Sequence, residues 1–206
     1  MKNSNVLMLL FVFLVTSAGW AAMVTADADG FGDGVNIGGA FAGVRLFATG
    51  DAAGLDGSVY AIESGLASTG SGVFANSVCD YEPFWHAAES GGFALKAVFQ
   101  QPANMVAVDI ISDDYIVGDT GGDFGVMYAY DSADNLLDFD DTEAIGYGDF
   151  ERVEIVRATY DISYVVIGGT LGSTVQLDNL SANIIPEPAT IVLLGCGGLF
   201  LTRRRK

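Results

Sequence analysis

Short apolar runs with a period of two residues constrain the fold of this chain more than any other feature. Between residues 27 and 185, runs of β-branched and aromatic residues alternate with stretches of Gly, Asp, Asn and Ser. In Val106-Ala107-Val108-Asp109-Ile110 the large apolar residues occupy every second position, and Val153-Glu154-Ile155 alternates in the same way. Such alternation is typical of half-buried strands, and no segment here has an apolar stripe of helical period over three turns. The pattern predicts an all-β region.

Ten segments fit this description. They are Ala40–Ala48, Gly57–Ile62, Gly72–Val78, Phe93–Phe99, Met105–Ile111, Gly125–Tyr130, Asn135–Phe139, Arg152–Arg157, Ile162–Ile167 and Thr174–Ile184. Many short strands without helices predict a two-sheet sandwich, most simply a jelly roll.

The first residues have the pattern of a secretory signal. Lys2 precedes an apolar run over Val6–Val15, and small residues follow. A run of this length is too short for the roughly 20 apolar residues of a membrane-spanning helix. Small residues at the −3 and −1 positions allow cleavage after Ala21 or after Ala26. We expect it after Ala26, because the acidic region begins at Asp27. An uncleaved N-terminal anchor is the alternative.

The last residues combine three parts. Pro186-Glu187-Pro188 is followed by an apolar run over 191–201 and by a basic cluster, Arg203, Arg204, Arg205 and Lys206. Prolines interrupt regular structure before the apolar run. The run predicts a short transmembrane helix, and the basic cluster is expected to stay on the cytoplasmic side.

This arrangement resembles the PEP-CTERM sorting domain of exported bacterial proteins. The resemblance covers about 20 residues and implies recognition by an exosortase, a membrane cysteine protease-transpeptidase. It further implies export through the Sec translocon, a transient membrane anchor, removal of the tail, and delivery to the cell surface or extracellular matrix, in bacteria that make exopolysaccharide and biofilm. The expected domains are a signal peptide at 1–26, an exported β-sandwich at 27–183 and the sorting signal at 184–206.

The exported region also resembles the bodies common among PEP-CTERM proteins. The similar segments are Phe99-Gln100-Gln101-Pro102, Val106–Asp109, Ala129-Tyr130-Asp131, Asn135–Leu137 and Val175–Leu180. These bodies are similar to jelly-roll carbohydrate-binding modules. The resemblance implies a fold, and a fold does not by itself imply a function.

Acidic residues dominate the exported region. It contains four basic and 25 acidic residues, which leaves a net charge of −21. Nucleic acid is excluded as a partner, because phosphate binding needs clustered Lys and Arg. An acidic surface is soluble and attracts cations.

Two carboxylate clusters are candidate calcium ligands, because calcium takes six to eight oxygen ligands. They are Asp113, Asp114, Asp119 and Asp123, and then Asp138, Asp140, Asp141 and Glu143. Neither has EF-hand spacing. The alternative is a solvated acidic surface. No other cofactor is expected.

Aromatic residues are the second candidate feature. Tyr81, Phe84 and Trp85 lie in a Pro-containing segment and are expected to be exposed, as a surface on which sugar rings could stack. Tyr128, Tyr130 and Tyr164 lie in expected strands, where a core position is the alternative.

Catalytic motifs are absent from the sequence. His86 is the single histidine, and no Gly-x-Ser-x-Gly motif, phosphate-binding loop or dinucleotide fingerprint occurs. We therefore expect a non-catalytic surface or matrix protein associated with exopolysaccharide. A calcium-assisted carbohydrate-binding module is one alternative, and a small glycan hydrolase with paired carboxylates is another.

Overall fold

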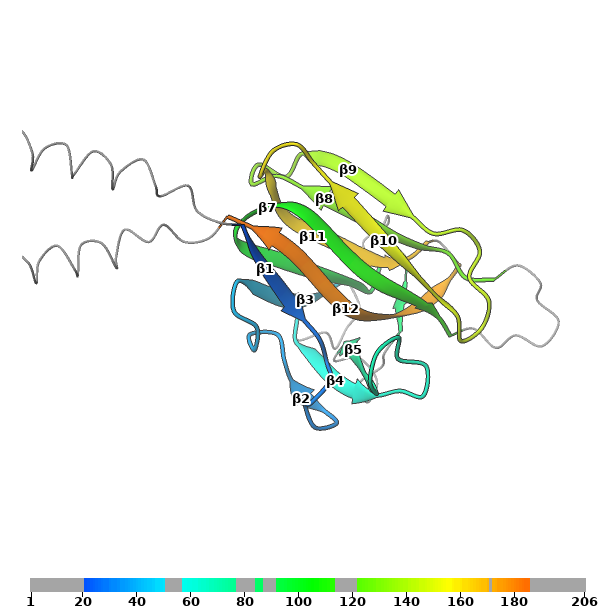
Figure 1. Ribbon diagram of the computed structural model, residues 1–206. Helices are drawn as coiled ribbons and strands as arrows, with labels where there is room; N and C mark the ends of the chain where they lie inside the picture. Colours follow the sequence, from blue (N-terminus) through cyan, green and yellow to red (C-terminus); the bar gives the residue numbers. More distant parts are fainter. Residues whose placement is uncertain are drawn as a thin grey trace, which may run out of the picture. The chain divides into compact units, whose positions relative to one another are not determined.

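The computed structural model describes residues 21–50, 57–76, 84–86, 92–113, 122–170 and 172–185, and all regular structure in these ranges is β-strand. The strands are β1 (Ala22–Ala26), β2 (Val35–Asn36), β3 (Val44–Thr49), β4 (Val59–Glu63), β5 (Gly72–Asn76), β6 (Trp85–His86), β7 (Ala94–Ser112), β8 (Gly125–Tyr130), β9 (Leu136–Asp141), β10 (Phe150–Val156), β11 (Ile162–Gly169) and β12 (Thr174–Ile184). The prediction of an all-β fold is confirmed (Figure 1).

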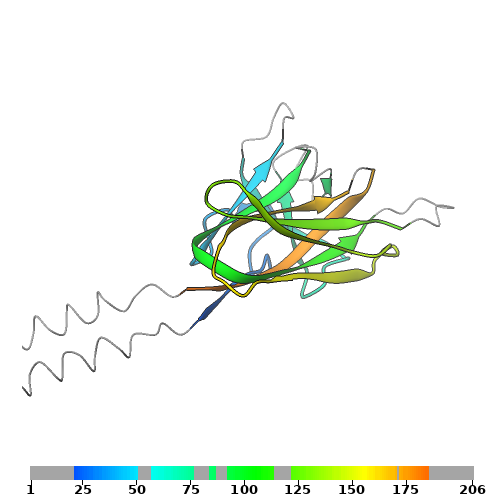
Figure 2. The same ribbon diagram turned by 90° about the horizontal axis from the view of Figure 1, so that it is seen from above.

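All of these strands belong to one antiparallel hydrogen-bonded sheet, whose continuity depends on β7. The first half of β7 pairs with β3 and β11, and its second half pairs with β10 and β12. Figures 1 and 2 show that the sheet turns back over itself along this long strand. The sequence predicted two separate sheets, whereas the shared strand joins them into one.

The expected break at Pro102 is wrong. Two strands were predicted around this proline, but β7 runs through it as a single strand of 19 residues. Proline lacks the N–H that a ladder needs. The register between β11 and β7 shifts at this point, from Tyr164 opposite Val98 to Ile162 opposite Ala103. The proline therefore lies where the pairing of β7 is already interrupted.

The folded unit begins before Asp27, the predicted start of the exported domain. It runs from Met23 to Ile184. Strand β1 pairs with β12, and its Val24 and Ala26 are buried in the core. Removal of the chain up to Ala26 would delete this strand, whereas cleavage after Ala21 would leave it intact.

The described residues contain no helix that is long and apolar enough to cross a membrane. The expected transmembrane helix, the Pro186-Glu187-Pro188 motif and the basic cluster lie outside the described residues, as does the apolar run of the signal segment.

Candidate functional site

One face of the half-sheet formed by β3, β7, β11, β8 and β9 carries a continuous set of aromatic and aliphatic side chains. Residues that pair across antiparallel strands lie on the same face, so each row of paired residues marks positions on it. One row is Phe47, Lys96, Val166, Tyr128 and Phe139, and its neighbour is Arg45, Val98, Tyr164, Tyr130 and Leu136. We call these ten residues the aromatic face.

The aromatic face points away from the core. The residues between its members, such as Leu46, Ala97 and Val165, are buried, whereas its own members are half-buried or exposed. Phe139 is 56% exposed and Leu136 is 53% exposed. A strand alternates sides at every residue, so the pattern that buries one set of residues necessarily presents the other set.

Tyr164 lies near the centre of this face. Its ring stacks on that of Tyr130, with centroids 4.8 Å apart and planes inclined by 10°. Lys96 Nζ lies 3.8 Å from the centroid of the Tyr164 ring. Strand β11 lies between β7 and β8, so Lys96 and Tyr130 approach Tyr164 from neighbouring strands on opposite sides. These contacts restrict the conformations of the Lys96, Tyr164 and Tyr130 side chains.

A hydrogen bond anchors the hydroxyl of Tyr164. It donates to Asp134 Oδ1 at 3.1 Å, in the turn between β8 and β9. Burial, together with this carboxylate, raises the pKa of Tyr164 to about 12. Asp131 closes the same turn by accepting from the backbone N–H groups of Ala133 and Asn135. Hydrogen bonds from Asn135, first of all from its side chain, lower the pKa of Asp131.

Two further ring contacts extend the aromatic face toward its edges. Tyr128 and Phe139 lie with their centroids 6.1 Å apart at an angle of 36°. At the opposite edge, the guanidinium carbon of Arg45 lies 5.7 Å from the centroid of the Phe47 ring. A cation within about 6 Å of a ring face is attracted by the ring quadrupole. Each cation of the face therefore contacts a ring: Arg45 contacts Phe47, and Lys96 contacts Tyr164.

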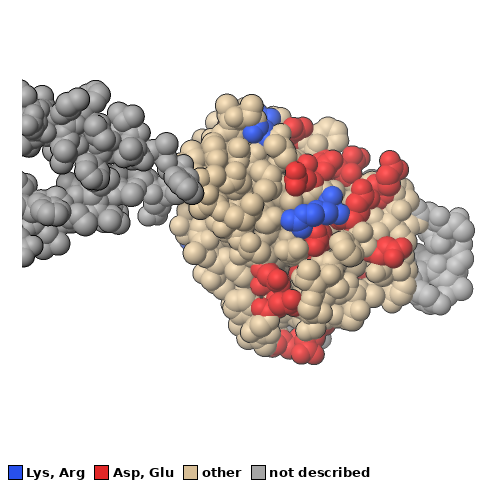
Figure 3. Space-filling model, in the orientation of Figure 1, with Lys and Arg blue, Asp and Glu red and all other residues tan. Residues whose placement is uncertain are grey.

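The four basic residues between residues 27 and 185 divide into two pairs. Arg152 forms an ion pair with Asp109, and Arg157 forms a bidentate one with Asp161. Hydrogen bonds from Arg157 lower the pKa of Asp161. Within the part of the chain that the structure describes, no ion pair includes Arg45 or Lys96. The surface in Figure 3 shows how sparse Lys and Arg are among the acidic side chains of one face.

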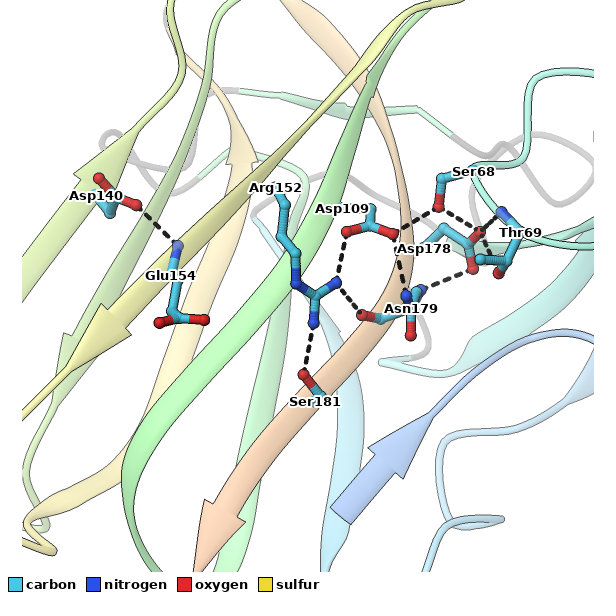
Figure 4. A network of polar contacts seen from close by, with 9 residues as sticks. All are labelled: Ser68, Thr69, Asp109, Asp140, Arg152, Glu154, Asp178, Asn179 and Ser181. Carbon is cyan, nitrogen blue, oxygen red and sulfur yellow. Dashed lines mark hydrogen bonds and ion pairs between the residues drawn. The ribbon is translucent and has the colours of Figure 1, made fainter. Parts of the chain in front are cut away.

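A different polar cluster lies on the outer face of the other half-sheet, in which the second half of β7 pairs with β10 and β12. The cluster surrounds Asp109 on β7 (Figure 4). Arg152 donates to Asp109 Oδ1 at 2.6 Å and to Ser181 Oγ at 2.7 Å. Asn179, at φ 50°, forms a bulge in β12, which keeps Asp178 and Ser181 on the same face. Asparagine tolerates this left-handed conformation better than most residues.

The loop between β4 and β5 is fastened to this cluster. Ser68 Oγ lies 2.8 Å from Asp109 Oδ2 and 2.9 Å from Asp178 Oδ2. The backbone N–H groups of Thr69 and Asn179 donate to the two oxygens of Asp178. Burial raises the pKa of Asp178. Both carboxylates are buried, and their oxygens accept internal hydrogen bonds, so the pair holds a loop and does not line a cleft.

The predicted sugar-stacking residues differ in their exposure to solvent. Phe84 is 37% exposed, in agreement with the expectation. The expectation for Trp85 is wrong: it is 0% exposed, and its indole N–H donates to the carbonyl oxygen of Phe74 at 2.9 Å. Strand β6 pairs with β12, which places the indole in the core. Tyr81 lies outside the described residues.

The acidic residues proposed as calcium ligands do not converge where they are described. Asp138, Asp140 and Asp141 lie on strand β9, not in a loop, and neighbouring strand residues point to opposite sides. Asp140 instead accepts from the backbone N–H of Glu154. No group of three metal-ligating side chains occurs among the described residues.

In the other acidic cluster, Asp123 is buried and accepts from Ser112 Oγ at 2.7 Å, and Asp113 accepts from Thr174 Oγ1. Asp114 and Asp119 lie outside the described residues, so calcium binding by this cluster stays a prediction.

Sequence reasoning missed most of the ten residues of the aromatic face. Tyr128, Tyr130 and Tyr164 were considered, but Phe47, Lys96 and Phe139 were not. The alternation in β8 and β11 was a usable signal for which residues share a face of one strand. The neighbours of each strand were not readable from the sequence.

Comparisons with known proteins show likeness of structure only. No protein-family model matches the chain, and no curated protein matches it. The K2 cleaved adhesin domain of Lys-gingipain is similar at 13% identity and a TM-score of 0.44, over 79% of this chain and 98% of that one. TmCBM61 in complex with β-1,4-galactotriose is similar at 12% identity and a TM-score of 0.36, over 75% and 96%.

The CBM22-1–GH10 modules of Clostridium thermocellum xylanase 10B are similar at 7% identity and a TM-score of 0.36, over 80% of this chain and 26% of that one. These three structures are an adhesin domain and two proteins with carbohydrate-binding modules. At these TM-scores the likeness carries no argument, and function rests on the residues of this chain.

Proposed function

We propose that this chain is an exported, non-catalytic carbohydrate-binding protein of the bacterial surface or extracellular matrix. In this proposal the sheet forms a jelly-roll-like sandwich, and the aromatic face binds a polysaccharide. The single observation that carries the proposal is the aromatic face itself: two rows of side chains across five strands, rich in rings and open to solvent.

The chemistry of the face suits sugars. A pyranose ring presents C–H groups on its faces and hydroxyl groups around its edge. Aromatic side chains provide large apolar area at low conformational cost, and tyrosine adds a polar group at its tip. Tyr130, Tyr164 and Lys96 are already held in one arrangement by their stacking and by Asp134. Little ordering is needed on binding, which favours affinity.

Export and sorting belong to the same proposal. We infer that a signal peptidase cleaves after Ala21, because this position preserves strand β1. The Pro186-Glu187-Pro188 motif and the basic cluster after it are proposed to direct the chain to an exosortase, after which the tail is removed. The protein would then act within the exopolysaccharide of the cell.

The binding proposal is tested by affinity electrophoresis of the full chain, in mild detergent, against a panel of neutral and acidic polysaccharides. Phe139→Ala removes an exposed ring from the face and should weaken binding by about tenfold, the equivalent of about 1.4 kcal/mol. Phe150→Ala is the matched control, because Phe150 is 51% exposed on β10, outside the aromatic face.

Retarded migration that Phe139→Ala abolishes and Phe150→Ala preserves would support the proposal. Equal effects of the two substitutions, or no retardation by any polysaccharide, would reject the aromatic face as a binding site.

The sorting proposal is tested in a host that has its exosortase. Replacement of Pro186-Glu187-Pro188 by three alanines should leave the tail on the protein, as intact-mass analysis would show. N-terminal sequencing of the exported protein should begin at Ala22. A tail removed normally from the alanine variant would refute exosortase recognition through this motif, and a start at Asp27 would refute the cleavage position.

A further inference from the structure

Among the four cations of the exported region, the two on the aromatic face have no acidic partner in the described part of the chain. Arg45 and Lys96 are diagonal neighbours on adjacent strands, since Arg45 pairs with Val98 and Lys96 pairs with Phe47. Their β-carbons are therefore about 7 Å apart. In a region with 25 acidic residues, two neighbouring cations that form no ion pair with a described carboxylate are a distinct feature of this face.

The rings beside these cations position them without neutralising them. A π-system attracts a cation through its quadrupole but carries no net charge. Lys96 Nζ over Tyr164 and the Arg45 guanidinium near Phe47 therefore keep their full charge for a ligand. Arg157 provides the contrast, because its guanidinium is engaged by both carboxylate oxygens of Asp161.

The opposite end of the face is acidic. Asp131 and Asp134 lie in the turn between β8 and β9, beside Tyr130 and Tyr164. The face is thus cationic over β3 and β7, aromatic over β11 and β8, and bordered by carboxylates at the β8–β9 turn. A uniformly charged ligand would be repelled at one end, whereas a chain of sugars with carboxylates at intervals can match both ends.

We propose that the aromatic face binds an anionic polysaccharide whose sugars carry carboxylate groups, with Arg45 and Lys96 as the residues that select for the charge. This rests on the proposed carbohydrate-binding function and names its ligand class. The carboxylates pair with the two cations, and uncharged ring faces of the same chain lie against Tyr130, Tyr128 and Phe139. Charge-assisted hydrogen bonds are the strong ones in such sites.

The test uses ligand pairs that differ only in charge. Hyaluronate and gellan, in which carboxylated sugars are separated by uncharged ones, are each compared with their methyl esters, by calorimetric titration of the full chain in mild detergent. We expect the acid forms to bind at least about tenfold more tightly than the esters, the equivalent of about 1.4 kcal/mol. The double variant Arg45→Gln, Lys96→Gln should remove this preference, so that the acid and ester forms bind with equal affinity. Arg157→Gln, which also removes a positive charge, should leave the preference intact.

The outcomes separate this inference from the function on which it rests. If acid and ester forms bind equally, and Phe139→Ala weakens both, the carbohydrate-binding function stands and the anionic preference is overturned. If neither form of either polymer binds, the selection of carboxylated sugars is overturned, and the wider panel above decides the function. A second copy of this acidic chain is the competing occupant: self-association in sedimentation velocity that the double variant abolishes would overturn the inference in its favour.

Discussion

The outer faces of the two half-sheets both carry basic side chains, but these side chains have different neighbours on the two faces. Around Asp109, the Arg152 guanidinium, two carboxylates and several hydroxyl groups satisfy one another and fasten the β4–β5 loop to the sheet. On the aromatic face, Arg45 and Lys96 lie on rings instead, and the rings stay open to solvent. The comparison teaches that a cation on this sheet stabilises the fold where it meets a carboxylate, and remains available for a ligand where it meets a ring.

The sharpest test of this difference is a pair of matched substitutions. Arg152→Met keeps the aliphatic stem but leaves the buried carboxylate of Asp109 without its cation. We expect a loss of about 2 kcal/mol in the free energy of unfolding, below the 3–5 kcal/mol of a fully buried pair because Arg152 is partly exposed. Lys96→Met should change it by less than about 0.5 kcal/mol. Urea denaturation measures both, and equal losses would remove the distinction between the two faces.

One part of the pH dependence of stability should come from the Asp109 side of the comparison. Burial raises the pKa of Asp178 above its ordinary 3.8, so the folded state holds this proton more tightly than the unfolded state does. The contribution of Asp178 to stability is therefore complete below pH 3.8 and is lost as pH rises through the folded-state pKa.

The measurement is the difference in unfolding free energy between the wild type and Asp178→Asn across this window. Since asparagine does not titrate, the difference should move against the wild type as pH rises. A difference that is constant with pH would show that Asp178 keeps an ordinary pKa in the folded state.

On the aromatic face, the expected effect is spectroscopic and small in energy. Burial and the Asp134 carboxylate raise the pKa of Tyr164 to about 12, so this phenol should ionise in a late step of an alkaline titration. A rapid alkaline pH jump followed by ultraviolet absorbance should detect this late step. Tyr164→Phe should abolish it, whereas Tyr147→Phe, on an exposed tyrosine outside the face, should not. A late step that survives Tyr164→Phe would show that it does not belong to Tyr164.

Much of the strand content was predictable because alternation is a local property. Gly125–Tyr130 and Thr174–Ile184 were predicted with the bounds that the structure shows. The strands β1, β2 and β6 were missed. Two of them are only two residues long, and β1 was assigned to the signal peptide. A strand of two residues, such as β2 or β6, is too short to show alternation.

Of the candidate site, the sequence supplied ring-bearing positions but not their environment. Trp85 and Phe84 are neighbours in the chain and look equally available, yet the first is buried and the second is exposed. Pairing of β6 with β12 decides this, through a partner some 90 residues later in the chain. Burial depends on such long-range contacts, which local composition does not reveal.

By itself, the sequence determined that the region from 27 to 185 is built of strands and strongly acidic, because periodicity and charge are properties of the chain. Only the tertiary structure decided that β7 joins both half-sheets, and that Arg45, Lys96 and Tyr164 meet on one face. Which strands lie side by side depends on the packing of the whole core, and every cation acquires its role from the neighbour that this pairing provides.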